Sequence, residues 1–234
     1  MEYFMIKFIF LDLDNTLLDF HKGELCAIKR TFKELNIPIN EQMLRRYMEI
    51  NVSCWRGLER GEKTLHQVLC GRFEMLFSEF GIDASATEVQ NLYQRLLSEE
   101  HDFIPGAKEL LDRLYDSGKY RLFMTTNGSP DVQYPRIADS GIGKYFEKIF
   151  ISYELGCAKP SKEYFDACFK EIEGFNKDEA IILGDSLSSD VKGGINAGIK
   201  SCHFNIFGNE YSDIIPDFTI TNILDFLEVL DQIK

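Results

Sequence analysis

Short apolar strands alternate with helices along most of the chain, and this alternation constrains the fold more than any other feature. Runs rich in β-branched and aromatic residues predict strands at 6–11, 120–126, 148–152, 180–183, 201–205 and near 218–219. Between them, helical periodicity predicts helices at 107–117, 131–140, 161–173, 187–197 and from 222 onward. Strands that alternate with helices are typical of βαβ units, which build a parallel sheet.

A long helical segment interrupts this alternation after the first strand. Residues 18–102 are rich in Glu, Lys, Arg and Gln, and they predict helices at 20–36, 41–60, 64–80 and 85–101. Pro105 and Gly106 mark the return to the alternating pattern. We therefore expect an α/β core with a Rossmann-like, doubly wound parallel sheet, formed by residues 1–17 and 103–234. An all-helical domain would be inserted at 18–102.

Composition and charge exclude several classes of protein. Apolar residues make up 44% of the 234 residues and charged residues 27%, which is typical of a globular chain rather than a disordered one. No apolar run approaches the length of a membrane span, so we expect no membrane association. The net charge is −12, and an acidic surface repels a phosphate backbone, so no nucleic-acid polymer is expected as a partner.

The cysteines and the first residues of the chain bear on its compartment. The six cysteines are scattered, and no Cys or His cluster has the spacing of a metal site. Met1 to Lys7 contain no basic region and no small-residue cleavage site, so we expect no signal peptide. Scattered single cysteines are typical of a reducing environment. We therefore expect a soluble, cytoplasmic protein.

Polar side chains follow four of the predicted strands. Taken singly, such residues often cap helices or form turns. Together, however, they would gather at one edge of the sheet, where ligands bind in open parallel sheets. Packing does not need several repelling carboxylates there, whereas Mg²⁺ prefers oxygen ligands and would neutralise them. The residues are Asp12 and Asp14, Thr126 and Asn127, Lys159, and Asp185 with Asp190.

The order of these motifs resembles that of the haloacid dehalogenase (HAD) superfamily. The resemblance covers essentially the whole chain, including a helical cap domain inserted after the first motif. It implies a Mg²⁺-dependent phosphomonoester hydrolase that acts through an aspartyl-phosphate intermediate. The motifs are, in order, Asp12-x-Asp14-x-Thr16, Thr126-Asn127, Lys159-Pro160, and Gly184-Asp185 followed by Asp190.

The resemblance assigns the catalytic and metal-binding roles to three carboxylates. Asp12 is the expected nucleophile, which would attack phosphorus and divide one difficult displacement into two steps. Asp14 is the expected general acid/base, which protonates the leaving oxygen and then deprotonates water. Asp12, the backbone carbonyl of Asp14, and Asp185 would be the protein ligands of Mg²⁺.

The remaining motif residues are expected to bind the phosphate or to support the site. Thr126 and the backbone amide of Asn127 would hold the phosphoryl oxygens. Lys159 would balance the charge of the nucleophile and the phosphate. Asp190 is expected to position Lys159 or a metal-bound water by a hydrogen bond, without contacting the metal itself.

Several other activities fit the sequence less well. In superfamily members that cleave carbon–halogen bonds, the first motif is similar to Asp-x-Tyr, with a tyrosine at the position of Asp14 in this chain. Dehalogenase activity is therefore not expected. A phosphomutase would need a cap group suited to protecting the phosphoenzyme from water, and no clear candidate is present. A phospho-accepting signalling receiver would not carry Asp-x-Asp on its first strand or a helical insert. A non-catalytic binding protein is expected to have lost a motif, whereas this chain has all four.

The cap is expected to set specificity, because the core recognises only phosphate. The segment from Asn51 to Gly61 contains Trp55, the only tryptophan, and Arg72 follows on the next predicted helix. These stretches resemble the cap of bacterial house-cleaning pyrimidine 5′-nucleotidases. Asn51 and Trp55 are therefore candidate substrate-binding residues, although Trp55 is at least as typical of a packed cap interior and Arg72 of an ion pair.

The expected substrate is a small phosphorylated metabolite. The resemblance of the cap favours a nucleoside 5′-monophosphate, with pyrimidines preferred. The alternative is a broad-specificity phosphatase of small sugar or carboxylic acid phosphates.

Overall fold

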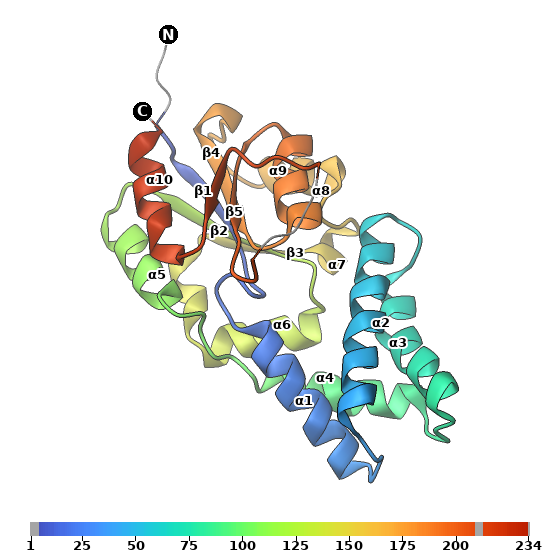
Figure 1. The fold of residues 1–234 in the computed structure, drawn as a ribbon. Helices are drawn as coiled ribbons and strands as arrows, with labels where there is room; N and C mark the ends of the chain where they lie inside the picture. The colour runs from blue at the N-terminus through green and yellow to red at the C-terminus, as the bar shows by residue number, and fades with distance from the viewer. Residues whose placement is uncertain (1–4, 209–212, 234) are drawn as a thin grey trace. The chain divides into compact units, whose positions relative to one another are not determined.

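The computed structural model describes residues 5–208 and 213–233, and the chain divides into two compact units (Figure 1). The core unit comprises residues 1–20 and 101–234, and the helical unit comprises residues 21–100. Met1 to Phe4, on which part of the expectation about a signal peptide rests, lie outside the described residues. No helix in the described part of the chain is long and apolar enough to cross a membrane.

A parallel sheet organises the core unit, as the sequence predicted. Its strand order is β3-β2-β1-β4-β5-β6, and every neighbouring pair is parallel. The chain winds outward from β1 in one direction and from β4 in the other, so the order switches between these two strands. Ligands bind at such a switch point. The strands are β1 Phe8–Asp12, β2 Arg121–Thr126, β3 Lys148–Ile151, β4 Ala180–Gly184, β5 Lys200–Phe204 and β6 Phe218–Ile220.

Helices cover both faces of the sheet, so the two central strands, β1 and β4, are buried along their whole length. Successive side chains of a strand point to opposite faces: Phe8 and Phe10 of β1 belong to one core cluster, and Ile9 and Leu11 belong to the other. Helices α5 and α10 lie on one side and α8 and α9 on the other (Figure 1). The helices are α5 Ala107–Asp116, α6 Pro130–Asp139, α7 Ser152–Leu155, α8 Lys162–Lys170, α9 Lys192–Ala197 and α10 Phe226–Gln232.

The helix predicted at 187–197 differs from the observed element in its first turn. Leu187–Val191 forms a π-helical turn, and α9 follows it. The side chain of Asp190 lies within this turn, and its Oδ2 accepts a hydrogen bond from the backbone N–H of Ser186 at 3.1 Å. π-Helical turns are rare and frequently occur at functional sites. The short helix α7 was not predicted either, because one turn has too few residues to show periodicity.

The elements described between residues 21 and 100 are all helices. Polar caps define where they begin: Asn40 caps α2, and Thr64 forms a reciprocal capping box with Gln67 at the start of α3. Gly81 ends α3 with a left-handed backbone that glycine adopts without steric cost. The helices are α1 Phe20–Glu34, which starts in the core unit, α2 Glu41–Glu59, α3 Leu65–Phe80 and α4 Ala86–Ser98.

A buried polar network links the four helices of this unit. Arg72 of α3 is 2% exposed, and its guanidinium donates to Asn51 Oδ1 at 2.8 Å and to Gln90 Oε1 at 2.9 Å. Asn51 in turn donates to Glu24 Oε1 at 2.6 Å. The guanidinium carbon also lies 4.7 Å from the ring centroid of Tyr93. Arg72 is therefore a buried tie between helices rather than a surface residue.

This network predicts that Arg72→Met destabilises the protein strongly. The substitution removes the positive charge and two hydrogen bonds from a buried network that also contains Glu24, and breaking a buried ionic network costs about 3–5 kcal/mol. The free energy of unfolding, measured in urea, should fall by that order. The control is Arg46→Met, because Arg46 pairs with Glu79 on the surface of the same unit at 2.7 Å and exposed pairs contribute little. Equal effects of the two substitutions would contradict the structural role of Arg72.

Candidate active site

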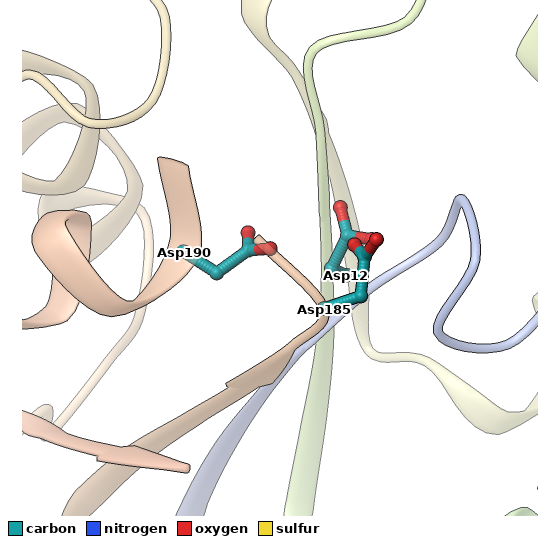
Figure 2. A group of neighbouring side chains, drawn as sticks. All are labelled: Asp12, Asp185 and Asp190. Atoms are coloured by element: carbon teal, nitrogen blue, oxygen red, sulfur yellow. The ribbon is translucent and has the colours of Figure 1, made fainter. Parts of the chain in front are cut away.

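Three carboxylates meet at the switch point of the sheet. Asp12 is the last residue of β1, and Asp185 directly follows β4, the neighbouring strand. Asp190 reaches the same place from the π-helical turn. One oxygen of each of these three carboxylates lies within 4.8 Å of the other two. Figure 2 shows the three side chains at the ends of their strands and turn. The strand order therefore brings together residues that are far apart in the sequence.

The ammonium group of Lys159 is buried between two of these carboxylates. Its Nζ donates to Asp12 Oδ1 at 2.6 Å, to Asp190 Oδ1 at 2.7 Å and to the backbone carbonyl of Thr125 at 3.0 Å. A lysine ammonium has three N–H donors, and all three are used. Burial alone would lower the pKa of Lys159, but attraction to Asp12 and Asp190 raises it above its ordinary value. Lys159 is therefore a fixed positive charge.

Keeping two of these carboxylates ionised costs free energy, as their raised pKa values show. Burial raises the pKa of Asp12 to about 7; Lys159 opposes this rise, and repulsion from Asp190 adds to it. Burial, followed by repulsion from Asp12 and Asp190, raises the pKa of Asp185 well above its ordinary value. A divalent cation would remove this cost. The donor set of the cluster consists of carboxylate oxygens alone, which fits a hard cation such as Mg²⁺.

Two further residues support the carboxylates, and their roles were not predicted from the sequence. Thr16 donates from Oγ1 to Asp12 Oδ2 at 3.1 Å and accepts from the backbone N–H of Asp185 at 3.1 Å. His203 Nε2 lies 2.9 Å from the backbone carbonyl of Asp185; since a carbonyl only accepts, the ring N–H donates. The histidines looked dispersed in the sequence, but His203 pairs in register with Gly184. Strand-end position, not sequence spacing, was the available signal.

Asn127 holds the backbone of Lys159 with its side chain. Its Nδ2 donates to the Lys159 carbonyl at 2.9 Å, and its Oδ1 accepts from the Lys159 N–H at 3.0 Å. This two-point contact fixes the loop that carries the lysine. Thr126 is 1% exposed, and its Oγ1 accepts from the backbone N–H of Gly128 at 3.1 Å. Phosphate binding by Thr126 and by the amide of Asn127 stays a prediction.

The carboxylate of Asp14 is held by helix α6. Arg136 Nη1 lies 2.5 Å from Asp14 Oδ1, and Gln133 Nε2 donates to Asp14 Oδ2 at 2.7 Å. Neither residue was singled out in the sequence. The available signal was their spacing, because residues three apart share one face of a helix, and this helix begins at Pro130, shortly after Thr126-Asn127.

The two substrate-binding residues expected from the cap lie in the helical unit. Asn51 is 4% exposed, and both ends of its amide are hydrogen bonded, to Arg72 and to Glu24. Trp55 lies one helical turn further along α2 and is half-buried. Contact of either residue with a substrate stays a prediction.

Residues 6–198 match the model of a family of hydrolases described as haloacid dehalogenase-like. The chain belongs to this family. The HAD-hydrolase YfnB of Bacillus subtilis (strain 168) is 36% identical over 224 residues, which cover 95% of this chain and 94% of YfnB. A crystal structure of YfnB bound to magnesium superposes with a TM-score of 0.91 at 35% identity, covering 97% of this chain and 99% of that chain.

Two other relatives of this HAD chain are named for their substrates. The pyrimidine 5′-nucleotidase PynA of Streptococcus pneumoniae (strain ATCC BAA-255 / R6) is 33% identical over 97% of this chain and 95% of its own length. The glyceraldehyde 3-phosphate phosphatase of Pyrococcus abyssi (strain GE5 / Orsay) is 32% identical over 86% of this chain and 82% of its own length. The chain is therefore an enzyme, a HAD-family hydrolase.

The carboxylate cluster predicts that Mg²⁺ raises the melting temperature. A ligand that binds only the folded state at 100 times its Kd adds about 2.7 kcal/mol of stability, which is several degrees for a chain of this size. Differential scanning fluorimetry with Mg²⁺ and with EDTA measures the shift.

The matched variants are Asp185→Asn and Asp112→Asn. Asp185→Asn should lose the shift and, because burial and repulsion raise the pKa of Asp185, should melt no lower than the original protein in EDTA. Asp112 lies on α5 and pairs with Lys108 on the surface, so Asp112→Asn should keep the full shift. The same shift in both variants would show that the cluster is not the binding site.

Proposed function

We propose that this HAD-family hydrolase is a Mg²⁺-dependent phosphatase that cleaves phosphate monoesters through an aspartyl-phosphate on Asp12. The observation that carries the proposal is the placement of the Asp12 carboxylate: it is buried at the switch point, bound to Lys159 at 2.6 Å, and clustered with Asp185. The magnesium in the YfnB crystal supports the choice of metal. Asp12, Asp185 and the backbone carbonyl of Asp14 would hold the ion, which supplies positive charge for the phosphoryl group.

The residues of the chain divide the reaction into two displacements. In the first, an Asp12 oxygen forms a bond to phosphorus while the bond from phosphorus to the ester oxygen breaks, and Asp14 gives that oxygen a proton. In the second, Asp14 takes a proton from water, which attacks phosphorus and releases Asp12 and inorganic phosphate. Lys159 offsets the charge of Asp12 and phosphate, and Thr126 and the amide of Asn127 hold the phosphoryl oxygens.

These roles predict different consequences for two neighbouring substitutions. Asp12→Asn should be inactive and should form no phosphoenzyme from radiolabelled substrate. Asp14→Asn should lose about 10²–10⁴-fold on alkyl phosphates, the usual contribution of a general acid, yet should still trap phosphoenzyme from 2,4-dinitrophenyl phosphate. Asp131→Asn, at an exposed position of α6, is the control and should turn over normally. Equal, mild losses at positions 12 and 14 would refute the assignment.

For the substrate, we propose a nucleoside 5′-monophosphate with a pyrimidine base. The similarity to PynA over nearly the whole chain supports this choice. Within the helical unit, the half-buried Trp55 is the better candidate for stacking on a base, which is worth about 1–3 kcal/mol. Asn51, with both ends of its amide occupied, would act by holding α2 in place. Stacking barely discriminates among bases, so a pyrimidine preference would need a hydrogen bond or a cavity that purines cannot use.

A second candidate substrate class is a small sugar or carboxylic acid phosphate. The glyceraldehyde 3-phosphate phosphatase relative favours it, because that similarity also spans most of the chain. The site residues would do the same chemistry on such a substrate, since the core recognises only the phosphate.

A substrate panel distinguishes the two candidates. We expect kcat/KM for UMP, dUMP and dTMP to exceed the values for AMP, GMP and several sugar phosphates by about tenfold, the effect of one hydrogen bond or cavity contact. All assays contain Mg²⁺, and 4-nitrophenyl phosphate reports the activity of each preparation. If a sugar phosphate exceeds all three pyrimidine nucleotides, the nucleotidase proposal is wrong while the phosphatase proposal stands.

A further inference from the structure

Two buried side chains of α6 form a closed set of hydrogen bonds with Asp14. Gln133 is 1% exposed and Arg136 is fully buried. Arg136 Nη1 contacts Asp14 Oδ1 at 2.5 Å and donates to Gln133 Oε1 at 2.8 Å, while Gln133 Nε2 donates to Asp14 Oδ2 at 2.7 Å. Each carboxylate oxygen of Asp14 therefore has its own donor. Two separate contacts fix the plane of the carboxylate as well as its position.

Gln133 also ties Asp14 to the hydroxyl of Thr126. The same Nε2 that donates to Asp14 donates to Thr126 Oγ1 at 2.8 Å, which already accepts from the N–H of Gly128. A hydroxyl oxygen has two acceptor sites and one donor hydrogen. Because both acceptor sites are filled, Thr126 is left to act as a donor, which is what binding a phosphoryl oxygen requires.

Gly128 leaves the space that Gln133 occupies. A Cβ at position 128 would lie 2.1 Å from Gln133 Nε2 and 2.6 Å from its Cδ, so any other residue there would displace the amide. The Arg136 guanidinium carbon lies 5.8 Å from the ring centroid of Phe20, a favourable cation–aromatic distance. The positions of both α6 side chains are thus set by their surroundings.

We propose that Gln133 and Arg136 are positioning residues for the general acid/base of this enzyme. They fix the position and the plane of the Asp14 carboxyl group, and Gln133 couples that position to Thr126, the proposed phosphate-binding residue. Proton transfer requires the acid to lie within hydrogen-bond reach of the leaving oxygen, so a carboxyl group released from α6 would transfer its proton less often. The inference rests on the proposed role of Asp14.

The test compares two esters that share a phosphate and a ring but differ in how much they need an acid. Phenyl phosphate needs a proton on its leaving oxygen, whereas 2,4-dinitrophenyl phosphate does not. For Gln133→Leu and Gly128→Ala, kcat/KM for phenyl phosphate should fall about 10- to 100-fold, a part of the usual effect of a general acid. The value for 2,4-dinitrophenyl phosphate should fall less than about threefold. A partly unfolded preparation lowers both values equally, so their ratio reports positioning and not folding.

Three further variants make the result decisive. Arg136→Lys keeps the charge but loses the planar fork, and its ratio should lie between those of the original protein and Gln133→Leu. Tyr134→Phe on the same helix removes only a surface hydrogen bond to Glu154 at 2.9 Å and should leave the ratio unchanged. Asp14→Asn sets the maximum change.

The outcomes separate this proposal from the proposed function. If Asp14→Asn raises the ratio of the dinitrophenyl to the phenyl ester while Gln133→Leu and Gly128→Ala do not, the positioning role is overturned and the acid role of Asp14 stands. If Asp14→Asn also leaves the ratio unchanged, the acid role fails and the positioning proposal fails with it. If this ratio rises in Asp14→Asn, Gln133→Leu and Gly128→Ala alike, the acid role of Asp14 and the positioning role of Gln133 are both supported.

Discussion

The buried ammonium group of Lys159 is the interaction on which the site depends. Burying a lysine is costly unless every donor is paired, and here Asp12, Asp190 and the carbonyl of Thr125 pair with all three N–H groups. These partners come from three different parts of the sheet edge, so the contact is possible only when β1, β2 and β4 are neighbours. In return, the lysine lowers the repulsion among carboxylates that the proposed chemistry needs close together.

Two glycines make room for this arrangement of side chains. A Cβ on Gly184 would lie 2.2 Å from the Asp190 carboxylate, and a Cβ on Gly128 would lie 2.1 Å from Gln133. Gly184 is the last residue of β4, and Gly128 lies two residues after the end of β2. At both places the backbone must let a side chain from the following helical segment approach. The glycines thus link the packing of helix on strand to the position of functional groups.

The polar interiors of the two units differ in what they do. In the core unit, buried charges converge on one point at the sheet edge, where we propose that an ion and a phosphate bind. In the helical unit, Arg72 donates to Asn51 and Gln90, and Asn51 donates to Glu24. That network specifies how four helices pack, since a buried polar group without partners is costly. Asn51 therefore contributes to the architecture of the unit that we propose sets substrate specificity.

The sequence by itself determined the parallel α/β sheet, the helical segment between its first two strands, and the order of motifs at the strand ends. Hydrophobic periodicity and chain order carry that information locally. Tertiary structure alone decided that Gln133 and Arg136 bind Asp14, that His203 supports Asp185, and that Arg72 is buried. The contacts of α6 and of Arg72 depend on how a helix is rotated against a sheet or another helix, and the His203 contact depends on the pairing of β4 with β5. Both are set by packing between segments distant in sequence. Local periodicity predicts which residues share a face, but not which partner that face meets.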